Sequence, residues 1–318
     1  MHPPYEITSA ASALLAEIER GLGRHEGALR VSAPPQLRRS SRVKTIHGSV
    51  SIEGNTLTEK QITAVLEGKR VIAPERDLLE VKNAIACYEL MTGWRSGSTV
   101  DFLAAHKKMM GGLVDNPGRW RSQGVGITKG DVVAHVPPPA DRVAGLMSSL
   151  MGWAKKERQL PAPILAAVVH YEIEFIHPFL DGNGRMGRLW HSLILLNYHP
   201  LFALVPIESV IKLRQSDYYQ VLGECDKEGK STRFIEFALE VTLEALTEIN
   251  RPAPRMTGGE RIELARDVFG TSWFSRKEYH GRYPGISTAT ASRDLRQAVA
   301  KGNLVSVGER ALMRYQFS

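Results

Sequence analysis

Hydrophobic residues recur at the spacing of an α-helix over most of the chain. One face of a predicted helix over residues 162–175 carries Ile164, Val168, Tyr171 and Phe175. The same periodicity predicts further helices over residues 7–22, from about 37, from about 58, and over 77–93, 99–110, 141–156, 185–198, 208–224 and 232–249. We therefore expect a mainly α fold class, a helical bundle, for the body of the chain.

The segment from Val125 to His135 interrupts this helical pattern. It alternates around Thr128-Lys129-Gly130-Asp131, which is a turn signal between two short strands. The edge strand of such a β-hairpin can pair with an extended segment of a target protein. The alternative is a hairpin with a purely structural role.

A second pattern follows a candidate linker at Arg251-Pro252-Ala253-Pro254 and Gly258-Gly259. Helices are predicted at about 259–269, from Ser275 and at about 288–301, with a hairpin over 304–317. Three helices and a hairpin resemble a winged helix, whose third helix fits a DNA major groove. The polar face of that helix holds Thr288, Ser292, Arg293 and Arg296. Many winged helices serve protein contacts or dimerisation instead, so both uses remain open.

With 318 residues, the chain is long enough for two or three domains. The patterns divide it into an N-terminal helical region over 1–95, a central domain over 96–250 and a winged-helix domain over 257–318.

Composition adds few restrictions. The formal charge of +7 permits a polyphosphate or nucleic-acid partner without establishing one. Two distant cysteines, Cys87 and Cys225, make no disulfide framework and fit a reducing cytoplasm. The chain has no apolar run of about 18 residues and does not begin with a secretory signal. We expect a cytoplasmic protein without a membrane partner.

A glycine-rich turn connects the predicted helix over 162–175 with the next one. Gly182 and Gly184 can adopt backbone angles that direct successive N–H groups inward, and the helix start adds unpaired N–H groups and a positive dipole end. Arg185 and Arg188, three residues apart, share a helix face and can both reach phosphate oxygens. This turn therefore suits a phosphate group.

The same twelve residues hold a base and a metal ligand. Asp181 offers a hard carboxylate oxygen for Mg²⁺, and His177 carries an imidazole, which suits removal of a proton from an attacking hydroxyl. The alternative is a structural corner in which the glycines only relieve strain. Such a corner gives no reason to collect a His, an Asp and two Arg, so we favour a catalytic loop.

The run His177-Pro-Phe-Leu-Asp-Gly-Asn-Gly-Arg185-Met-Gly-Arg188 resembles the signature of the Fic family, H-P-F-x-[D/E]-G-N-G-R-x-x-R, without a departure. The resemblance extends from about residue 40 to about 245. It implies a Fic-type helical bundle with a hairpin flap. It also implies transfer of AMP from ATP and Mg²⁺ to a Ser, Thr or Tyr hydroxyl of a protein, which is the activity of a nucleotidyltransferase.

The resemblance also implies residue roles. His177 would be the general base and Asp181 the metal ligand. Asn183, with the backbone of Gly182 and Gly184, would form the anion hole. The distal phosphates would bind Arg185 and Arg188. Phe179 would anchor the loop in the core. The Tyr218-Tyr219 pair resembles the region that lines the adenine pocket, so Tyr219 is a candidate nucleotide ligand; relatives often have an amide where Asp226 stands here.

A carboxylate continues an apolar helix face in the N-terminal region. Val43, Ile46 and Val50 form a stripe whose next position is Glu53. Glu53 also stands near the C-terminal end of its helix, where a negative charge is disfavoured, and Gly54 follows as the expected helix stop. These features suggest a compensating partner for the carboxylate. The alternative is a solvated Glu at a frayed helix end.

The run Ser49-Val-Ser-Ile-Glu53-Gly54 resembles the inhibitory motif of autoinhibited Fic proteins, [S/T]-x-x-x-E-[G/N]. The resemblance implies a salt bridge from Glu53 to Arg188 that removes a phosphate ligand, with Ser49 hydrogen-bonded near the same site. In some relatives the same Glu supports removal of AMP, and the sequence does not decide this.

These observations predict a protein adenylyltransferase that Glu53 inhibits. Its expected partners are ATP, Mg²⁺, a protein substrate docked at the 125–135 hairpin, the chain itself through self-modification, a second copy in a homodimer, and DNA through residues 259–318. One alternative is a DNA-binding regulator that uses the Fic fold as a nucleotide sensor. Another is transfer of a different group, such as UMP or phosphocholine.

Overall fold

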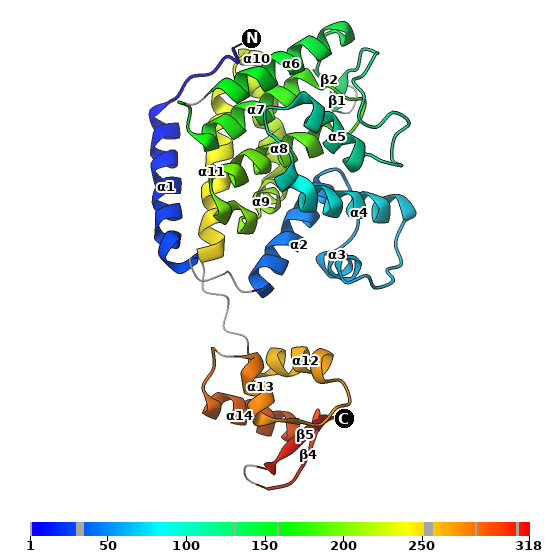
Figure 1. Cartoon of the computed structure of the whole chain (residues 1–318), viewed down its shortest axis with the longest axis vertical. Helices are drawn as coiled ribbons and strands as arrows, with labels where there is room; N and C mark the ends of the chain where they lie inside the picture. The colour runs from blue at the N-terminus through cyan, green and yellow to red at the C-terminus, as the bar shows by residue number, and fades with distance from the viewer. Residues whose placement is uncertain are drawn as a thin grey trace. The chain divides into compact units, whose positions relative to one another are not determined.

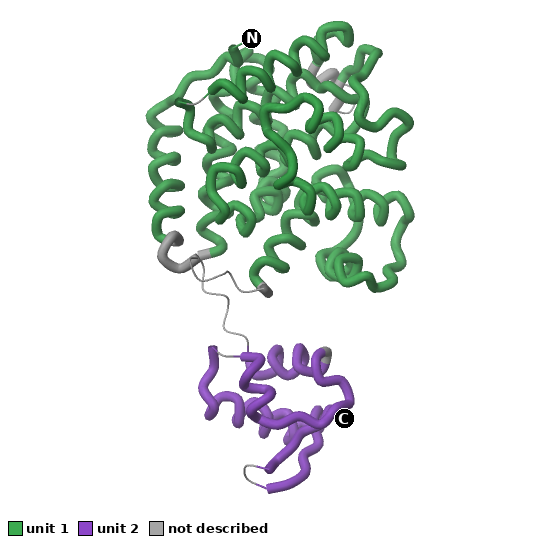
Figure 2. The backbone as a smooth tube through the Cα atoms, in the orientation of Figure 1, with its two compact units in different colours: residues 1–250 green, residues 251–318 purple. Residues whose placement is uncertain are grey.

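The computed structural model describes residues 2–29, 35–129, 132–157, 159–250, 257–283, 285–309 and 312–318. The chain folds into two compact units, residues 1–250 and residues 251–318 (Figure 2). The N-terminal region and the central domain, which the sequence separates at residue 95, both belong to unit 1 and share one hydrophobic core.

Unit 1 is helical, as the hydrophobic periodicity predicts (Figure 1). Its α-helices are α1 (Ser9–Leu29), α2 (Pro35–Ile52), α3 (Glu59–Leu66), α4 (Glu75–Leu90), α5 (Thr99–Met109), α6 (Ala140–Lys156), α7 (Ala162–Ile176), α8 (Asn183–Tyr198), α9 (Ile207–Leu213), α10 (Gln215–Glu228) and α11 (Thr232–Asn250). Short 3₁₀ helices follow α4 at Met91–Gly93 and α8 at Pro200–Leu204.

Helices α7 and α8 form the centre of unit 1 and lie against each other. Most side chains of α7 are buried on every face, which explains why its sequence is more apolar than an ordinary surface helix. Around this pair, α11 packs on α7, and α1 runs beside α11 (Figure 1). The loop that joins α7 to α8 is therefore fixed at both ends by buried helices.

The core of α7 contains a buried carboxylate, Glu172. Its side chain is 1% exposed, and its Oε2 has no hydrogen-bond partner among the described residues. Burial raises the pKa of Glu172 to about 7, because desolvation penalises the charged form. A raised folded-state pKa means that the stabilising contribution of this group is complete below its unfolded pKa and is lost as the pH rises to about 7.

We expect the change in the free energy of unfolding caused by Glu172→Gln to be more favourable to the folded state at pH 8 than at pH 5. The ionised carboxylate costs about 3 kcal/mol of folding free energy at the higher pH, by order of magnitude, and the amide does not ionise. Urea unfolding of the variant and of wild type at both pH values measures the difference. Glu244→Gln, which changes an exposed carboxylate on α11, is the control. Equal effects of Glu172→Gln at the two pH values would contradict the assignment.

Two boundaries differ from the sequence prediction. The single helix predicted over 208–224 is two helices, α9 and α10, because the backbone of Arg214 leaves the helical region at φ −105°, ψ 32°. The Arg214 guanidinium bonds to Asp217 (3.2 Å) and Glu240 (3.0 Å), which fixes the start of α10. Helix α8 begins at Asn183, two residues before the predicted start.

The predicted hairpin is confirmed. Strands β1 (Ile127–Lys129) and β2 (Val132–His135) pair antiparallel, with a register irregularity between Ile127 and Thr128. The turn residues 130 and 131 lie outside the described residues, as do the linker residues 251–256.

Unit 2 has its own small core. Its elements are α12 (Gly258–Phe269), β3 (Phe274–Ser275), α13 (Arg276–Arg282), α14 (Thr288–Ala300), β4 (Leu304–Val307) and β5 (Arg314–Phe317), and its sheet has the order β3-β5-β4. Gly258 and Gly259, predicted to be linker residues, belong to α12, because Thr257 and Glu260 form a capping box that starts the helix there. Strand β3 was not predicted.

The third helix of unit 2 presents a polar face. Thr288, Arg293 and Arg296 of α14 are exposed, whereas Asp294 points inward and accepts a 2.7 Å bond from buried Arg261. This is the face that the sequence analysis named as a candidate for DNA binding or for protein contacts. The winged-helix assignment and DNA binding both stay predictions.

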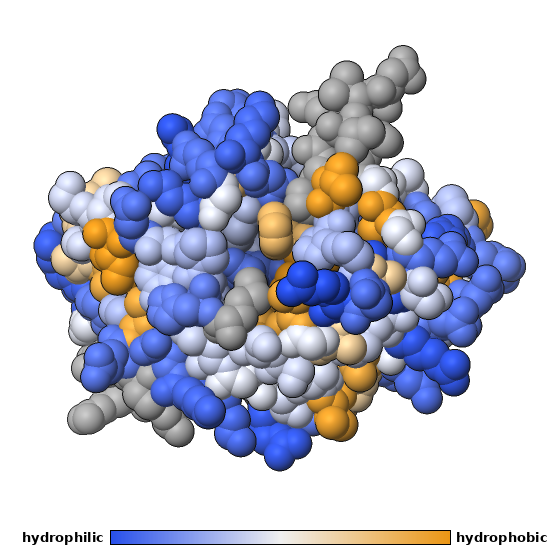
Figure 3. All heavy atoms as spheres, turned by 90° about the horizontal axis from the view of Figure 1, so that it is seen from above, coloured by the Kyte–Doolittle hydropathy of each residue, from blue (hydrophilic) through white to orange (hydrophobic). Residues whose placement is uncertain are grey.

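The surface mixes polar and apolar residues. On the face drawn in Figure 3, hydrophobic residues occur singly or in small groups among hydrophilic ones, as is normal for protein surfaces. Within the described residues, no helix combines the length and the apolar character needed to cross a bilayer.

Candidate active site

The loop between α7 and α8 begins at a residue with an unusual backbone. His177 ends α7 in the left-handed conformation, φ 49° and ψ 61°, and it is the only residue other than glycine with a positive φ in the described part of the chain. A residue that has a Cβ atom is strained in this conformation, so surrounding contacts must stabilise it. The imidazole Nδ1 lies 3.3 Å from the Glu174 carbonyl oxygen. Donation from Nδ1 to this carbonyl leaves Nε2 as the basic nitrogen.

Arg121 supplies much of that hold. Its Nε donates to the His177 carbonyl (2.7 Å), its Nη2 to the carbonyls of Ile176 (3.3 Å) and Pro138, and its backbone N–H to the Pro178 carbonyl (2.9 Å). The side chain is buried, and burial lowers the pKa of the guanidinium. The sequence analysis gave Arg121 no role.

Asn183 closes the loop on itself. Its side-chain oxygen accepts from the Phe179 N–H and its Nδ2 donates to the Phe179 carbonyl, both at 2.9 Å. The Asn183 side chain thus binds the loop backbone, and its role in an anion hole stays a prediction. The backbone N–H groups at the start of α8 remain for an anion, because the first turn of a helix has no intrahelical acceptors.

The loop rests on His106 and Phe179. The two rings stack with centroids 3.5 Å apart, and Phe179 is fully buried, as predicted. The Gly118 N–H donates to His106 Nδ1 (2.8 Å), so Nε2 carries the proton that bonds to the Asp181 carbonyl (3.0 Å). Burial lowers the pKa of His106 to about 4, which keeps the ring neutral. The sequence analysis missed His106.

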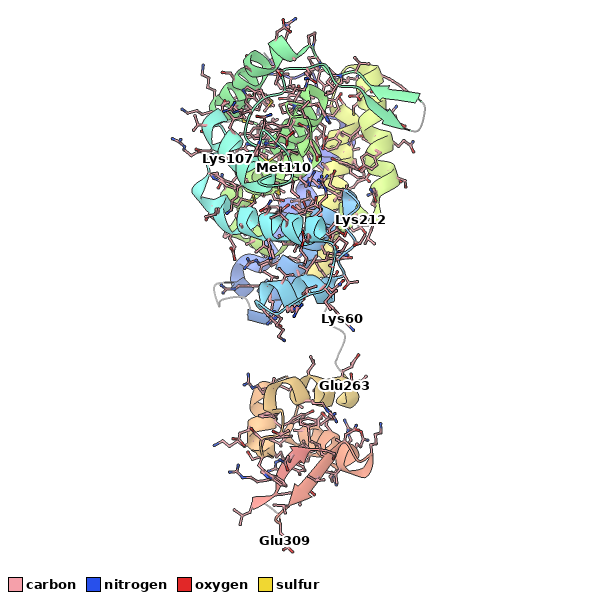
Figure 4. All side chains as sticks on the ribbon, turned by 90° about the vertical axis from the view of Figure 1, so that its right-hand side faces the viewer. Lys60, Lys107, Met110, Lys212, Glu263 and Glu309 are labelled. Carbon is pink, nitrogen blue, oxygen red and sulfur yellow. The ribbon has the colours of Figure 1, made fainter. Side chains whose placement is uncertain are left out.

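The two glycines of the loop act differently. Gly182 has φ 90°, as the predicted turn requires, and a Cβ there would lie 2.8 Å from the sulfur of Met110, the residue labelled in Figure 4. Gly184 lies inside α8 and needs no special backbone angle, which corrects the prediction. A Cβ at Gly184 would lie 2.8 Å from Glu53 Oε1 and 3.0 Å from Arg188 Nη1. Gly184 therefore leaves room for an ion pair.

That ion pair is the one predicted between Glu53 and Arg188. Arg188 Nη2 donates to Glu53 Oε1 (2.6 Å) and to the Ser49 carbonyl (3.1 Å). The Arg188 side chain is 1% exposed, whereas that of Glu53 is 25% exposed. Burial lowers the pKa of the guanidinium, but the Glu53 carboxylate, together with Tyr218 and Glu174, more than offsets this effect, and the pKa is raised. Two residues 135 positions apart thus form one ion pair, with its cation buried.

Gly54 has its predicted role in the inhibitory motif, whereas Ser49 contacts Arg188 through its backbone. Gly54 follows α2 with φ 92° and is the helix stop. The stripe of Val43, Ile46 and Val50 is buried, so Glu53 does extend an apolar face. The Ser49 hydroxyl is buried and makes no hydrogen bond to Glu53 among the described residues; it is the Ser49 carbonyl that contacts Arg188.

Arg185 has a different environment from Arg188. It is buried, forms an ion pair with Glu80 of α4, and donates to Asp181 Oδ1 (2.8 Å). Asp181 Oδ1 also accepts from the Gly182 N–H (2.6 Å). The carboxylate of Asp181 is 41% exposed, and its Oδ2 lies 3.8 Å from Arg76. Arg185 and Asp181 are thus neighbours, as their proximity in the motif predicts.

The candidate nucleotide ligand Tyr219 lies beside this cluster. It is 45% exposed on α10, whereas Tyr218 is buried and donates to Glu174 Oε1 (2.8 Å). Burial and, after it, the charge of the Glu53 carboxylate raise the pKa of Tyr219. Asp226, whose nucleotide contact the sequence left in doubt, accepts from the Tyr171 hydroxyl (2.9 Å).

Known proteins resemble this chain in sequence and in fold. The Fic/DOC family model matches residues 97–195. A crystal structure of a Fic family protein from Desulfovibrio desulfuricans G20 is 40% identical, covers 100% of this chain and 98% of that protein, and has a TM-score of 0.78. A protein named protein adenylyltransferase Fic from Culex quinquefasciatus is 29% identical over 268 residues, 79% of this chain and 50% of that protein. Its namesake from Drosophila grimshawi is 31% identical over 214 residues, 63% of this chain and 41% of that protein.

The helical bundle, the loop and these likenesses define the class: the chain belongs to the Fic family. It spans about half the length, or less, of the curated relatives it matches.

Proposed function

We propose that the chain is a protein adenylyltransferase, which transfers AMP from ATP to a Ser, Thr or Tyr hydroxyl, and that Glu53 inhibits this transfer. The observation that carries the proposal is the ion pair between Glu53 and the buried Arg188 beside the His177 loop. Among the described residues, the carboxylate paired with this arginine comes from a segment 135 positions away, and the arginine lies in the first turns of α8, after the histidine; this arrangement suits a phosphate site that Glu53 occupies. The names of the curated relatives support AMP as the transferred group.

The reaction would begin at His177. Its Nε2 accepts the proton of the acceptor hydroxyl, and the hydroxyl oxygen forms a bond to the α-phosphorus of ATP. The bond from that phosphorus to the bridging oxygen breaks, and pyrophosphate leaves. Because charge develops on the phosphate oxygens, the N–H groups at the start of α8 and the Arg188 guanidinium would stabilise the transition state.

A magnesium ion fits Asp181. Magnesium in nucleotide sites is held by one or two carboxylates together with the phosphates. The described residues contain no group of three or more His, Cys, Asp or Glu that would hold a metal ion by themselves, which agrees with an ion that arrives with ATP. The half-exposed Asp181 carboxylate would hold it, and its charge would offset that of the phosphates.

Glu53 would act by occupying Arg188. While the carboxylate is bound, this cation is unavailable to the distal phosphates, so ATP lacks one ligand that orients it. The protein substrate would pair with an edge of the β1–β2 hairpin, because a two-stranded sheet leaves backbone groups unpaired on its outer edges.

Label transfer tests the proposal. We expect the Glu53→Gly protein to incorporate label from α-³²P-ATP into itself and none from γ-³²P-ATP, because only the AMP part is retained. Wild type should incorporate at least about tenfold less, since it loses one charge-assisted contact to phosphate. Incorporation from γ-labelled ATP would show phosphoryl transfer instead. Labelling by UTP or a choline nucleotide, with none by ATP, would show a different transferred group.

A further inference from the structure

The C-terminal end of α2, directly before Glu53, is held by two side chains from elsewhere in the fold. Lys212 of α9 donates from Nζ to the Ser51 carbonyl (2.8 Å). Gln215 of α10 donates from Nε2 to the Ile52 carbonyl (3.0 Å). Lys212 Nζ also donates to Gln215 Oε1 (2.8 Å), so the two side chains support each other.

A helix end of this kind needs such partners. The last carbonyls of an α-helix have no intrahelical donors, and the dipole makes this end negative, so a cation there is favourable. Helix α2 has no basic residue in its own last turn. Lys212 supplies the missing cation from a neighbouring helix.

The close approach of α9 to α2 depends on Gly48. A Cβ at Gly48 would lie 2.5 Å from the Glu208 carbonyl carbon, so α2 and α9 touch backbone to backbone at this point. Glu53 lies in the turn that follows Ser51, whose carbonyl accepts from Lys212. In this turn the Glu53 N–H donates to the Val50 carbonyl (3.1 Å) and the Gly54 N–H donates to the Ser51 carbonyl (3.2 Å). The carbonyl that Lys212 binds is therefore part of the turn that aims Glu53.

We propose that Lys212 is a positioning residue for inhibition: its ammonium fixes the end of α2 so that the Glu53 carboxylate stays on Arg188. The regulatory part of this inference rests on the proposed function. Lys212 is partly buried and contacts neither the His177 loop nor Arg188 through the hydrogen bonds of the described residues. Its loss would loosen Glu53 without removing any part of the loop.

The Lys212 hydrogen bond is not the only contact that fixes the segment around Glu53. On the other side of Glu53, Asn55 Nδ2 donates to the Asp77 carbonyl (3.0 Å) and to Glu80 Oε2 (2.8 Å). Removal of the Lys212 ammonium should therefore release Glu53 only in part.

Hydrogen exchange tests the structural part. We expect Lys212→Met, which keeps the aliphatic stem, to speed exchange of the Glu53 and Gly54 amides by about tenfold, the effect of losing one charge-assisted hydrogen bond. Lys227→Met, a change of an exposed lysine on α10, is the matched control. Lys212 is preferred to Gln215 because Gln215 also bonds to Tyr219, a candidate nucleotide ligand. Unchanged exchange at both amides would overturn the inference.

Label incorporation tests the regulatory part. In an otherwise wild-type chain, Lys212→Met should raise self-labelling from α-³²P-ATP about tenfold, to a level below that of Glu53→Gly. In the Glu53→Gly background it should change nothing, because the carboxylate that it positions is gone. A residue that merely supports the fold would lower activity in both backgrounds, and that result, or no change in either, would overturn the assignment.

The two measurements separate the two ideas. Faster exchange with no label in any variant, Glu53→Gly included, would support the hold on α2 and refute the proposed activity. Strong labelling of Glu53→Gly, with unchanged exchange and labelling in Lys212→Met, would support the activity and refute the role of Lys212.

Discussion

Replacement of His177 by Asn should reduce self-labelling of the Glu53→Gly protein by about 10²- to 10⁴-fold, the usual contribution of a general base. Asn cannot accept a proton from a hydroxyl at neutral pH. It also tolerates the left-handed backbone that His177 adopts better than Ala does, so the change tests the imidazole with little strain on the loop. The measurement is the initial rate of label incorporation from α-³²P-ATP.

Two controls accompany this variant. Its melting temperature should match that of Glu53→Gly, and its Kd for ATP should change by less than about threefold, because the proposed phosphate ligands are intact. Retention of more than about a tenth of the labelling rate would show that another group removes the proton. The proposal that His177 is the base would then be wrong.

The sequence predicts the local part of the site well, because that part is local in the chain. The turn, the helix start and the groups of the His177 loop lie within twelve residues, so spacing alone brings them together. Glu53 was different. Its position on an apolar stripe indicated a buried carboxylate, but the choice of Arg188, 135 positions away, came only from the resemblance, and the structure contains that pair.

Other features could not be predicted from spacing. Arg185 and Arg188 share a helix face, yet one pairs with Glu80 of α4 and the other with Glu53 after α2. Which carboxylate reaches which arginine depends on how α2 and α4 pack on α8, and no periodic pattern contains that information. His106 was missed for a related reason, since it contacts a backbone carbonyl and an aromatic ring, which leave no signature in the sequence.

Arg121 is the residue whose loss should cost the most stability. Arg121→Met removes hydrogen bonds to four carbonyls, those of His177, Ile176, Pro138 and Gln123, and leaves these acceptors without that donor. We expect a loss of about 3 to 5 kcal/mol in the free energy of unfolding, as for other buried charged groups whose partners are left behind. The melting temperature of unit 1 should fall by about 10 °C.

The matched control is Arg119→Met, which changes an exposed arginine two positions away. It should leave the melting temperature within about 1 °C, since surface substitutions are nearly neutral. Because Arg121 holds the carbonyl of His177, Arg121→Met in the Glu53→Gly background should also reduce labelling at temperatures well below melting. A stable variant with unchanged labelling would show that Arg121 is not needed to hold the left-handed backbone of His177.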